Sequence, residues 1–92
     1  MEMLSIGAID AALLKLPDWK RTTAGEATAI QRDYKFANFV KAMEFVNQVA
    51  EKAEAAGHHP DIAISYNRVT LTITTHDAGG VTVKDVELAE KL

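Results

Sequence analysis

The middle of the chain carries apolar residues at helical spacing. They recur three or four positions apart, which is the pattern of one helix face, at Phe39, Val40, Met43, Val46, Ala50 and Ala53. Asn38 is a suitable N-cap, and Gly57 stands where a left-handed residue would end the helix. Phe45 and Val49 widen the apolar stripe. We therefore predict a long helix from Asn38 to Gly57 with a second apolar surface available for another contact.

Two shorter helices are predicted near the ends of the chain. The first covers residues 5–16, with Ser5 as its N-cap and Pro17 as its stop. The second covers residues 82–92, after a glycine pair that breaks the chain.

Alternating apolar and polar residues predict four strands, over residues 19–24, 28–36, 62–66 and 69–76. Gly25 forms the turn between the first two strands. A tight hairpin joins the last two, and we expect Asn67 to take its positive φ. The last strand has one face opposite Leu71 and Ile73 that is rich in threonine and ends in His76.

The order of these elements is α-β-β-α-β-β-α. Hairpins require antiparallel pairing, so the predicted fold is an α+β domain over residues 1–92, with one four-stranded antiparallel sheet and three helices packed on one face. A chain of 92 residues buries a small core, and it contains no cysteine for a disulfide. Because exposed sheet edges are usually covered or paired, self-association is one way to stabilise this chain.

The charge balance excludes some classes of partner. Ten Lys and Arg against thirteen Asp and Glu give a net charge of −3. The basic residues are scattered, whereas nucleic-acid binders carry a clustered basic face. The N-terminus lacks the pattern of a signal peptide, and no stretch approaches the roughly 20 apolar residues of a membrane span. We expect a cytoplasmic protein that binds neither nucleic acid nor membrane.

All three histidines are predicted to meet at one end of the sheet. His58 and His59 follow the long helix directly, and the last hairpin returns His76 to the level where its partner strand begins. Imidazole suits proton transfer near neutral pH. A metal site and a set of surface histidines are the alternatives. The metal site is the weaker of these, because adjacent residues in an extended segment point to opposite faces.

Three further residues have both a structural and a chemical interpretation. Glu54 lies one turn before His58, where it could hold that imidazole. Asp85 follows Thr82 at capping-box spacing, which also places it near the loop after His76. Trp19, the one tryptophan, belongs either to the core or to the wall of a ligand cleft.

The sequence resembles the pterin-4a-carbinolamine dehydratases over essentially its whole length. Trp19 and Phe36-x-x-Phe39 fit that family, and the specific signature is Glu54-x-x-x-His58-His59-Pro60, Tyr66-Asn67-x-Val69, Thr75-His76-Asp77, Gly79-Gly80-Val81-Thr82 and Asp85. The chain departs from the family mildly, for example at Val81, where leucine is usual.

The resemblance implies an activity and a site. The activity is dehydration of a 4a-hydroxytetrahydropterin to the quinonoid dihydropterin by histidine acid/base catalysis, with no metal and no other cofactor. The implied residues are the catalytic His58, His59 and His76, the supporting Glu54 and Asp85, and the substrate-binding Trp19, Pro60, Thr75 and Asp77. Within this set we expect His58 and His76 to exchange protons with the leaving hydroxyl, and His59 to position the ring.

The resemblance also implies partners. These are the pterin substrate, further copies of the chain in a homodimer or homotetramer, and an aromatic amino acid hydroxylase in the same pathway. A second function is possible on this basis, a non-catalytic dimerisation or transcriptional-cofactor module of the same fold.

Overall fold

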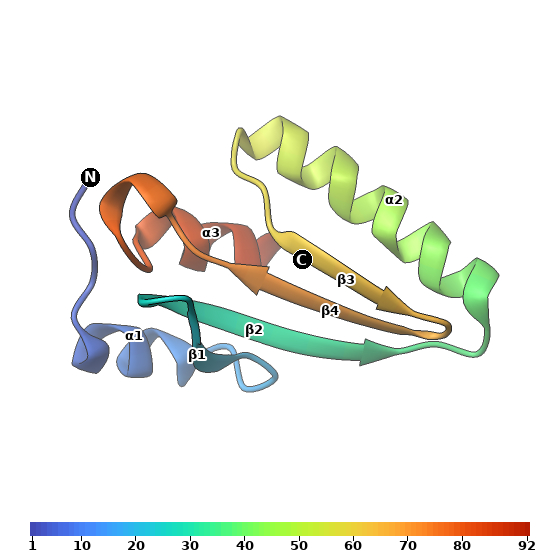
Figure 1. Ribbon diagram of the computed structural model, residues 1–92, viewed down its shortest axis with the longest axis horizontal. Coiled ribbons are helices and arrows are strands. Elements are labelled where there is room, and N and C mark those ends of the chain that lie inside the picture. Colours follow the sequence, from blue (N-terminus) through green and yellow to red (C-terminus); the bar gives the residue numbers. More distant parts are fainter.

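The structure is a computed structural model that describes residues 1–92. Its elements are α1 (Ile6–Leu13), β1 (Lys20–Ala24), β2 (Ala27–Lys35), α2 (Phe39–Ala56), β3 (Asp61–Ser65), β4 (Arg68–Ile73), the 3-10 helix η1 (His76–Ala78) and α3 (Val83–Lys91). The strands form one antiparallel sheet in the order β1-β2-β4-β3 (Figure 1). The predicted fold class is confirmed. None of the helices combines the length and apolar character needed to cross a membrane.

A single apolar cluster joins the helices to one face of the sheet. Its sheet residues alternate along β4, and its members are Ile9, Trp19, Ile30, Ala42, Val49, Val69, Leu71, Ile73, Val81, Leu88 and Ala89. These residues come from α1, α2, α3, two of the strands and, for Trp19 and Val81, the connections beside them, so the three helices share one core.

The ends of α2 follow the predicted capping residues. The Asn38 side chain accepts a hydrogen bond from the Lys41 amide at 2.9 Å. Gly57 adopts the left-handed conformation, with φ 65°, which glycine reaches without steric cost. In α1, the Ser5 side chain caps the helix as predicted. This helix ends at Leu13, before the predicted end at residue 16.

The core-facing side of α2 differs from the prediction. Val49, which we expected on an outer contact surface, is 1% exposed, whereas Phe39, predicted on the inner face, is 49% exposed. Ala42 and Ala53 are buried beside Val49. The apolar arc of this helix is too broad for periodicity to select the inner half. Packing selects the side with small residues, because they let the helix approach the sheet closely.

An aromatic cluster closes the core where β2 meets α2. The ring centroid of Phe45 lies 4.4 Å from that of Tyr34 and 5.1 Å from that of Phe36. The guanidinium of Arg32 lies over the Tyr34 ring at 4.4 Å. Burial raises the pKa of the Tyr34 phenol, and the nearby charge of Arg32 partly opposes this shift.

We expect Phe45→Ala to lower the free energy of unfolding by about 2–3 kcal/mol, because it removes the ring between Tyr34 and Phe36. Phe39→Ala on the same helix is the matched control and should cost less, since Phe39 is half-exposed. Urea denaturation measures both. Equal losses would show that Phe45 is not a core residue.

The β3–β4 hairpin has an unexpected backbone conformation. Its two-residue loop consists of Tyr66 and Asn67, and Tyr66 has the positive φ of 54° that we predicted for Asn67. The Asn67 side chain donates to the Phe36 carbonyl at 2.9 Å, and the Phe36 amide donates to the Asn67 carbonyl at 2.8 Å. Asn67 therefore ties the hairpin to the β2–α2 connection. A non-glycine residue in this region costs roughly 1–2 kcal/mol, which falls on Tyr66.

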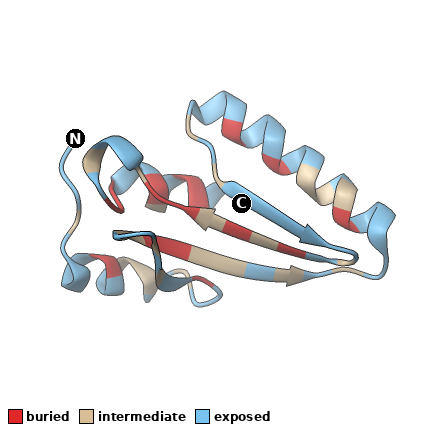
Figure 2. Ribbon diagram, viewed as in Figure 1, coloured by how far each residue is buried: buried red, intermediate tan, exposed pale blue.

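The two edge strands of the sheet, β1 and β3, differ in how far other parts of the chain contact them. The helix α1 contacts β1 through a hydrogen bond from Arg21 to Asp10 at 2.9 Å. By contrast, all five residues of β3 are exposed, so that β3 is pale along its whole length in Figure 2. The strand β3 is thus an open edge.

Candidate active site

Three chain segments converge at one end of the sheet. They are the turn after α2, the segment after β4, and the start of α3 (Figure 1). The left-handed Gly57 reverses the chain at the end of α2, and the His58 amide then bonds back to the Ala53 carbonyl at 3.2 Å. This turn directs the two adjacent histidines toward the end of β4.

A cavity of about 300 Å³ lies between these segments. Its lining consists of Gly57, His58, His59, Thr74, Thr75, His76 and Asp77. The predicted convergence of the three imidazoles is therefore confirmed. The lining side chains are imidazole, hydroxyl and carboxylate groups, and no hydrophobic side chain is among them. No group of three His, Asp or Glu side chains is arranged so that it could share a metal ion.

The loop that presents His76 is closed on itself. Thr75 and Gly80 form an isolated antiparallel bridge, with N–H to carbonyl distances of 3.2 and 3.3 Å. Gly79 makes the turn with φ 81°. Gly80 packs so tightly that an added Cβ would lie 2.5 Å from the Thr28 hydroxyl. The loop that contains the short helix at His76 is thereby held against the start of β2.

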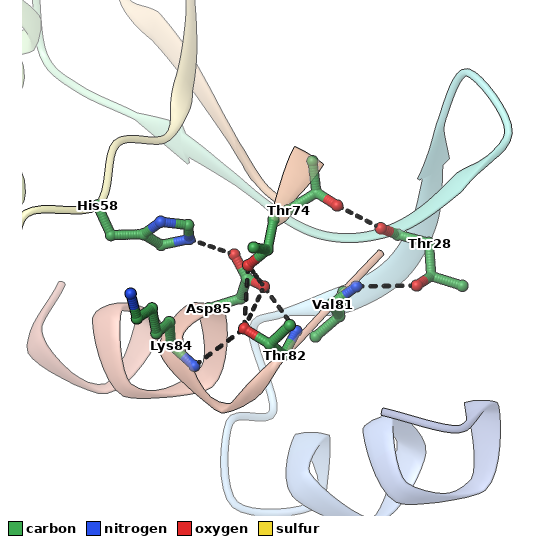
Figure 3. A network of polar contacts seen from close by, with 8 residues as sticks. Thr28, His58, Thr74, Val81, Thr82, Lys84 and Asp85 are labelled. Carbon is green, nitrogen blue, oxygen red and sulfur yellow. Dashed lines mark hydrogen bonds and ion pairs between the residues drawn. The ribbon is translucent and has the colours of Figure 1, made fainter. Parts of the chain in front are cut away.

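Asp85 joins this loop to His58 and is the most buried polar group of the site. It is 0% exposed. One carboxylate oxygen accepts hydrogen bonds from the Thr82 amide at 2.7 Å and from the Thr75 hydroxyl at 2.8 Å. The other oxygen lies 2.5 Å from Nε2 of His58 (Figure 3). The predicted capping box between Thr82 and Asp85 is present, and the same carboxylate also contacts His58.

The network assigns the tautomer of His58. A carboxylate that accepts from an amide and a hydroxyl is an acceptor at its second oxygen too, so Nε2 of His58 carries the proton between them. In the neutral imidazole, Nδ1 is then unprotonated and can accept a proton. The fixed ring of His58 is therefore suited to proton exchange.

Glu54 pairs with a different histidine than the sequence suggested. Its carboxylate contacts Nε2 of His59, not His58. The reason is the turn at Gly57, which directs His58 toward α3 and leaves His59 beside the last turn of α2. Both partners of the Glu54–His59 pair are largely exposed, so we expect this pair to contribute little to stability.

The remaining predicted site residues are placed as follows. His76 and Asp77 are exposed at the cavity, and Thr75 is half-buried. Pro60 is half-buried beside His59 and is not part of the lining. Trp19 is not at this cavity: it is buried and lines a separate cavity of about 160 Å³ with the end of α3.

Comparison with known proteins gives one family over the whole chain. A family model described as "Pterin 4 alpha carbinolamine dehydratase" matches residues 2–92. The chain is 54% identical over 92 residues to a protein of Gloeobacter violaceus named "Putative pterin-4-alpha-carbinolamine dehydratase 2", with all of both chains covered. The chain belongs to the pterin-4-alpha-carbinolamine dehydratase family.

Other relatives agree with this family assignment. A protein of Acidobacterium capsulatum named "Putative pterin-4-alpha-carbinolamine dehydratase" is 53% identical, and the match covers 100% of this chain and 96% of that one. A crystal structure from Brucella melitensis, described as a transcriptional coactivator/pterin dehydratase, has a TM-score of 0.88 and 38% identity, with 98% and 94% of the two chains covered. A pterin dehydratase-like protein described as a RuBisCO assembly factor has a TM-score of 0.66 and 16% identity over 80% of this chain and 83% of that one, which shows the fold alone.

The dehydratase signature of this chain separates into cavity residues and fold residues. The histidines and Thr75 line the cavity, whereas Asn67 anchors the hairpin at the opposite end of the sheet. Sequence reasoning missed Gly57 and Thr74 as lining residues. The helix-ending glycine directly before two histidines was the available signal for Gly57. For Thr74, the alternation that also reaches His76 placed it on the open face of the sheet, where its hydroxyl bonds the Thr28 carbonyl at 2.7 Å.

Proposed function

We propose that this protein dehydrates a 4a-hydroxytetrahydropterin to the quinonoid dihydropterin and water by histidine acid/base catalysis. The observation that carries the proposal is the cavity itself, in which three imidazoles surround about 300 Å³ and one of them is held by a fully buried carboxylate. Membership of the dehydratase family supports the substrate class.

The reaction requires two proton transfers. The C4a–O bond of the substrate breaks, and the departing hydroxyl takes up a proton and leaves as water. A second proton leaves N5, and the electron pair of that N–H bond forms the C4a=N5 double bond. The enzyme supplies one proton and receives one, so it returns to its starting state. Positioned acid/base groups accelerate such steps by on the order of 10²–10⁴-fold.

The histidines have distinct surroundings, and we assign their roles accordingly. His58, with its ring fixed by Asp85, and the exposed His76 exchange protons with the leaving hydroxyl and N5. His59, paired with the exposed Glu54, positions the pterin ring. Thr75 and Asp77 line the cavity as substrate-binding candidates. Pro60 is half-buried and restricts the backbone of His59 to extended conformations. Trp19 supports the core instead of the substrate.

Self-association belongs to this proposal. Chains of this family are expected to form homodimers or homotetramers, and here the open edge β3 and the exposed Phe39 and Val40 of α2 offer surfaces for it. An aromatic amino acid hydroxylase in the cytoplasm would supply the substrate. These exposed surfaces also favour the second candidate function, a non-catalytic binding module of the kind suggested by the description of the Brucella relative as a coactivator.

Turnover number separates the two candidates. We expect one protein chain to convert many equivalents of 4a-hydroxytetrahydropterin, with quinonoid dihydropterin measured by its absorbance. A binding module would hold at most one pterin per chain and would leave the rate of dehydration unchanged. A rate that does not rise with protein concentration therefore contradicts the enzymatic proposal.

A further inference from the structure

A second cavity, of about 160 Å³, lies between the α1–β1 connection, the strand β2 and the last turn of α3. It shares no lining residue with the histidine cavity. Two residues that the proposed dehydration leaves unused, Trp19 and Arg32, meet in its lining. This cavity is therefore a separate candidate site.

Arg32 is a charged residue on the core-facing side of the sheet. It pairs with Leu71 across the ladder, and its neighbours on the same face of β2 are Ile30 and Tyr34. Its side chain is 30% exposed, and its ion pair joins Nη2 to Oδ2 of Asp18 at 3.4 Å. A guanidinium carries five N–H donors. Because one long contact uses few of these donors, Arg32 brings spare hydrogen-bonding capacity to the cavity lining.

The hydroxyl of Tyr34 is a second polar group near this place with no partner. It is buried and forms no hydrogen bond. Burial raises its pKa, and the charges of Arg32 and Asp18 act on it in opposite directions, so the hydroxyl lies within reach of both. The large majority of buried polar side-chain atoms have a partner, and an exception needs an explanation. A polar ligand group beside Arg32 would provide one.

The side chains around the second cavity carry both signs of charge. Lys15 and Arg32 are cationic, whereas Asp18 and Glu90 are anionic. Neither Lys15 nor Glu90 forms an ion pair within the chain. A site for phosphate or another simple anion would carry an excess of positive charge. Balanced charges fit a zwitterion instead, because a planar guanidinium matches a carboxylate and a free carboxylate attracts an ammonium group.

The rest of the lining is mainly apolar. Trp19, the one tryptophan of the chain, is 5% exposed, and Leu16, Pro17 and Ala89 line the cavity with it. A protein cavity of about 150 Å³ holds a molecule of the size of benzene. The second cavity therefore has room for an apolar side chain of the size of leucine or phenylalanine beside its charged groups.

We propose that the second cavity binds a free α-amino acid with a large apolar side chain. The α-carboxylate pairs with the guanidinium of Arg32, next to Lys15, and the α-ammonium pairs with the carboxylate of Glu90. The apolar side chain packs against Trp19. None of these residues lines the histidine cavity, so the site does not depend on the proposed dehydration, and its test uses no pterin.

The fluorescence of Trp19 tests the proposal, because it is the whole tryptophan signal of the protein. L-Phenylalanine is the probe, with excitation at wavelengths that it does not absorb. We expect a saturable change in emission, and isothermal titration calorimetry should give one ligand per chain. L-Serine is the control for the apolar contact and should bind at least about tenfold more weakly. The absence of a saturable signal with L-phenylalanine in both measurements overturns the proposal.

Two derivatives test whether both charges of the ligand are recognised. N-acetyl-L-phenylalanine lacks the ammonium group, and L-phenylalaninamide lacks the carboxylate. Each should bind about tenfold more weakly than L-phenylalanine, since each loses one charged contact. Equal affinity for all three compounds overturns the proposal. So does a preference for either derivative, because that result assigns the site to the end of a peptide and not to a free amino acid.

The variant Glu90→Gln tests the ammonium contact without disturbing the core, because Glu90 is exposed. We expect it to bind L-phenylalanine about tenfold more weakly and to bind N-acetyl-L-phenylalanine as the wild type does. Arg32→Lys keeps the charge but loses the planar fork, so it should weaken both ligands. Glu87→Gln is the matched control, an exposed carboxylate of the same helix outside this cavity. If Glu90→Gln binds L-phenylalanine as tightly as Glu87→Gln does, the proposal is wrong.

Discussion

Replacing His58 with alanine is expected to lower kcat/KM for dehydration by about 10²–10⁴-fold. His58 is the imidazole whose ring is fixed by a buried carboxylate, with Nδ1 left free for proton exchange. The fold should survive, because Asp85 keeps its bonds from the Thr82 amide and the Thr75 hydroxyl. Steady-state kinetics measure the loss, and circular dichroism checks the fold.

Glu54→Gln is the control for this prediction. Glu54 also contacts a histidine, but its pair with His59 is exposed, so we expect a change in kcat/KM below about fivefold. A His58→Ala protein with the wild-type rate would show that His58 is not an acid or base. If Glu54→Gln lowers kcat/KM as much as His58→Ala does, then the rate depends on both histidine–carboxylate pairs and not specifically on the buried pair of His58 and Asp85.

Replacing Asp85 with alanine is expected to lower the free energy of unfolding by about 3 kcal/mol. The change leaves the buried Thr82 amide without its acceptor, removes one partner of the Thr75 hydroxyl, and removes the Asp85 half of the capping box at the start of α3. For a small domain with a total stability of roughly 5–10 kcal/mol, this is a large fraction. Urea denaturation measures it. Glu87→Ala is the matched control, because Glu87 is an exposed carboxylate on the same helix.

Asp85→Asn separates the structural role of Asp85 from its effect on His58. Asparagine keeps the shape and one acceptor oxygen, so it should be more stable than Asp85→Ala. Its amide cannot accept both from the cap and from His58, so the tautomer of His58 is no longer fixed. We expect Asp85→Asn to lower kcat clearly relative to the wild type, while it lowers the free energy of unfolding less than Asp85→Ala does. If Asp85→Asn matches the wild-type kcat, then Asp85 acts only as a helix cap.

The convergence of the histidines could be predicted because it depends on local signals. Gly57 ends a helix whose capping and period are clear, and a two-residue hairpin fixes where β4 returns. These features place His58 and His76 at one end of the sheet with no need for long-range packing detail. The capping box of Thr82 and Asp85 was visible for the same reason, since it is set by spacing along one helix.

The features that the sequence did not predict depend on packing between distant segments. Which carboxylate meets which histidine is decided by the direction of the chain after Gly57, which sends His58 to Asp85 and leaves His59 with Glu54. The inner face of α2 is decided by how closely small residues let it approach the sheet. The periodicity of one segment predicts neither the direction of the chain after Gly57 nor how closely α2 packs on the sheet.

Placement of Trp19 and Tyr66 illustrates the same limit. A lone aromatic residue fits both a core and a cleft, and only the packing against α3 puts Trp19 in the core. The positive φ was assigned to Asn67 by its intrinsic preference, but the bond from its side chain to Phe36 places Asn67 in the other loop position.

The central claim is that the three-histidine cavity performs the dehydration. The most direct measurement follows the absorbance of 4a-hydroxytetrahydropterin as it decays at neutral pH in three samples: buffer alone, the wild-type protein, and a protein carrying both His58→Ala and His76→Ala. We predict that the wild-type protein accelerates the decay and that the double variant returns the rate close to that in buffer. Equal rates in all three samples, or a double variant as fast as the wild type, would contradict the account.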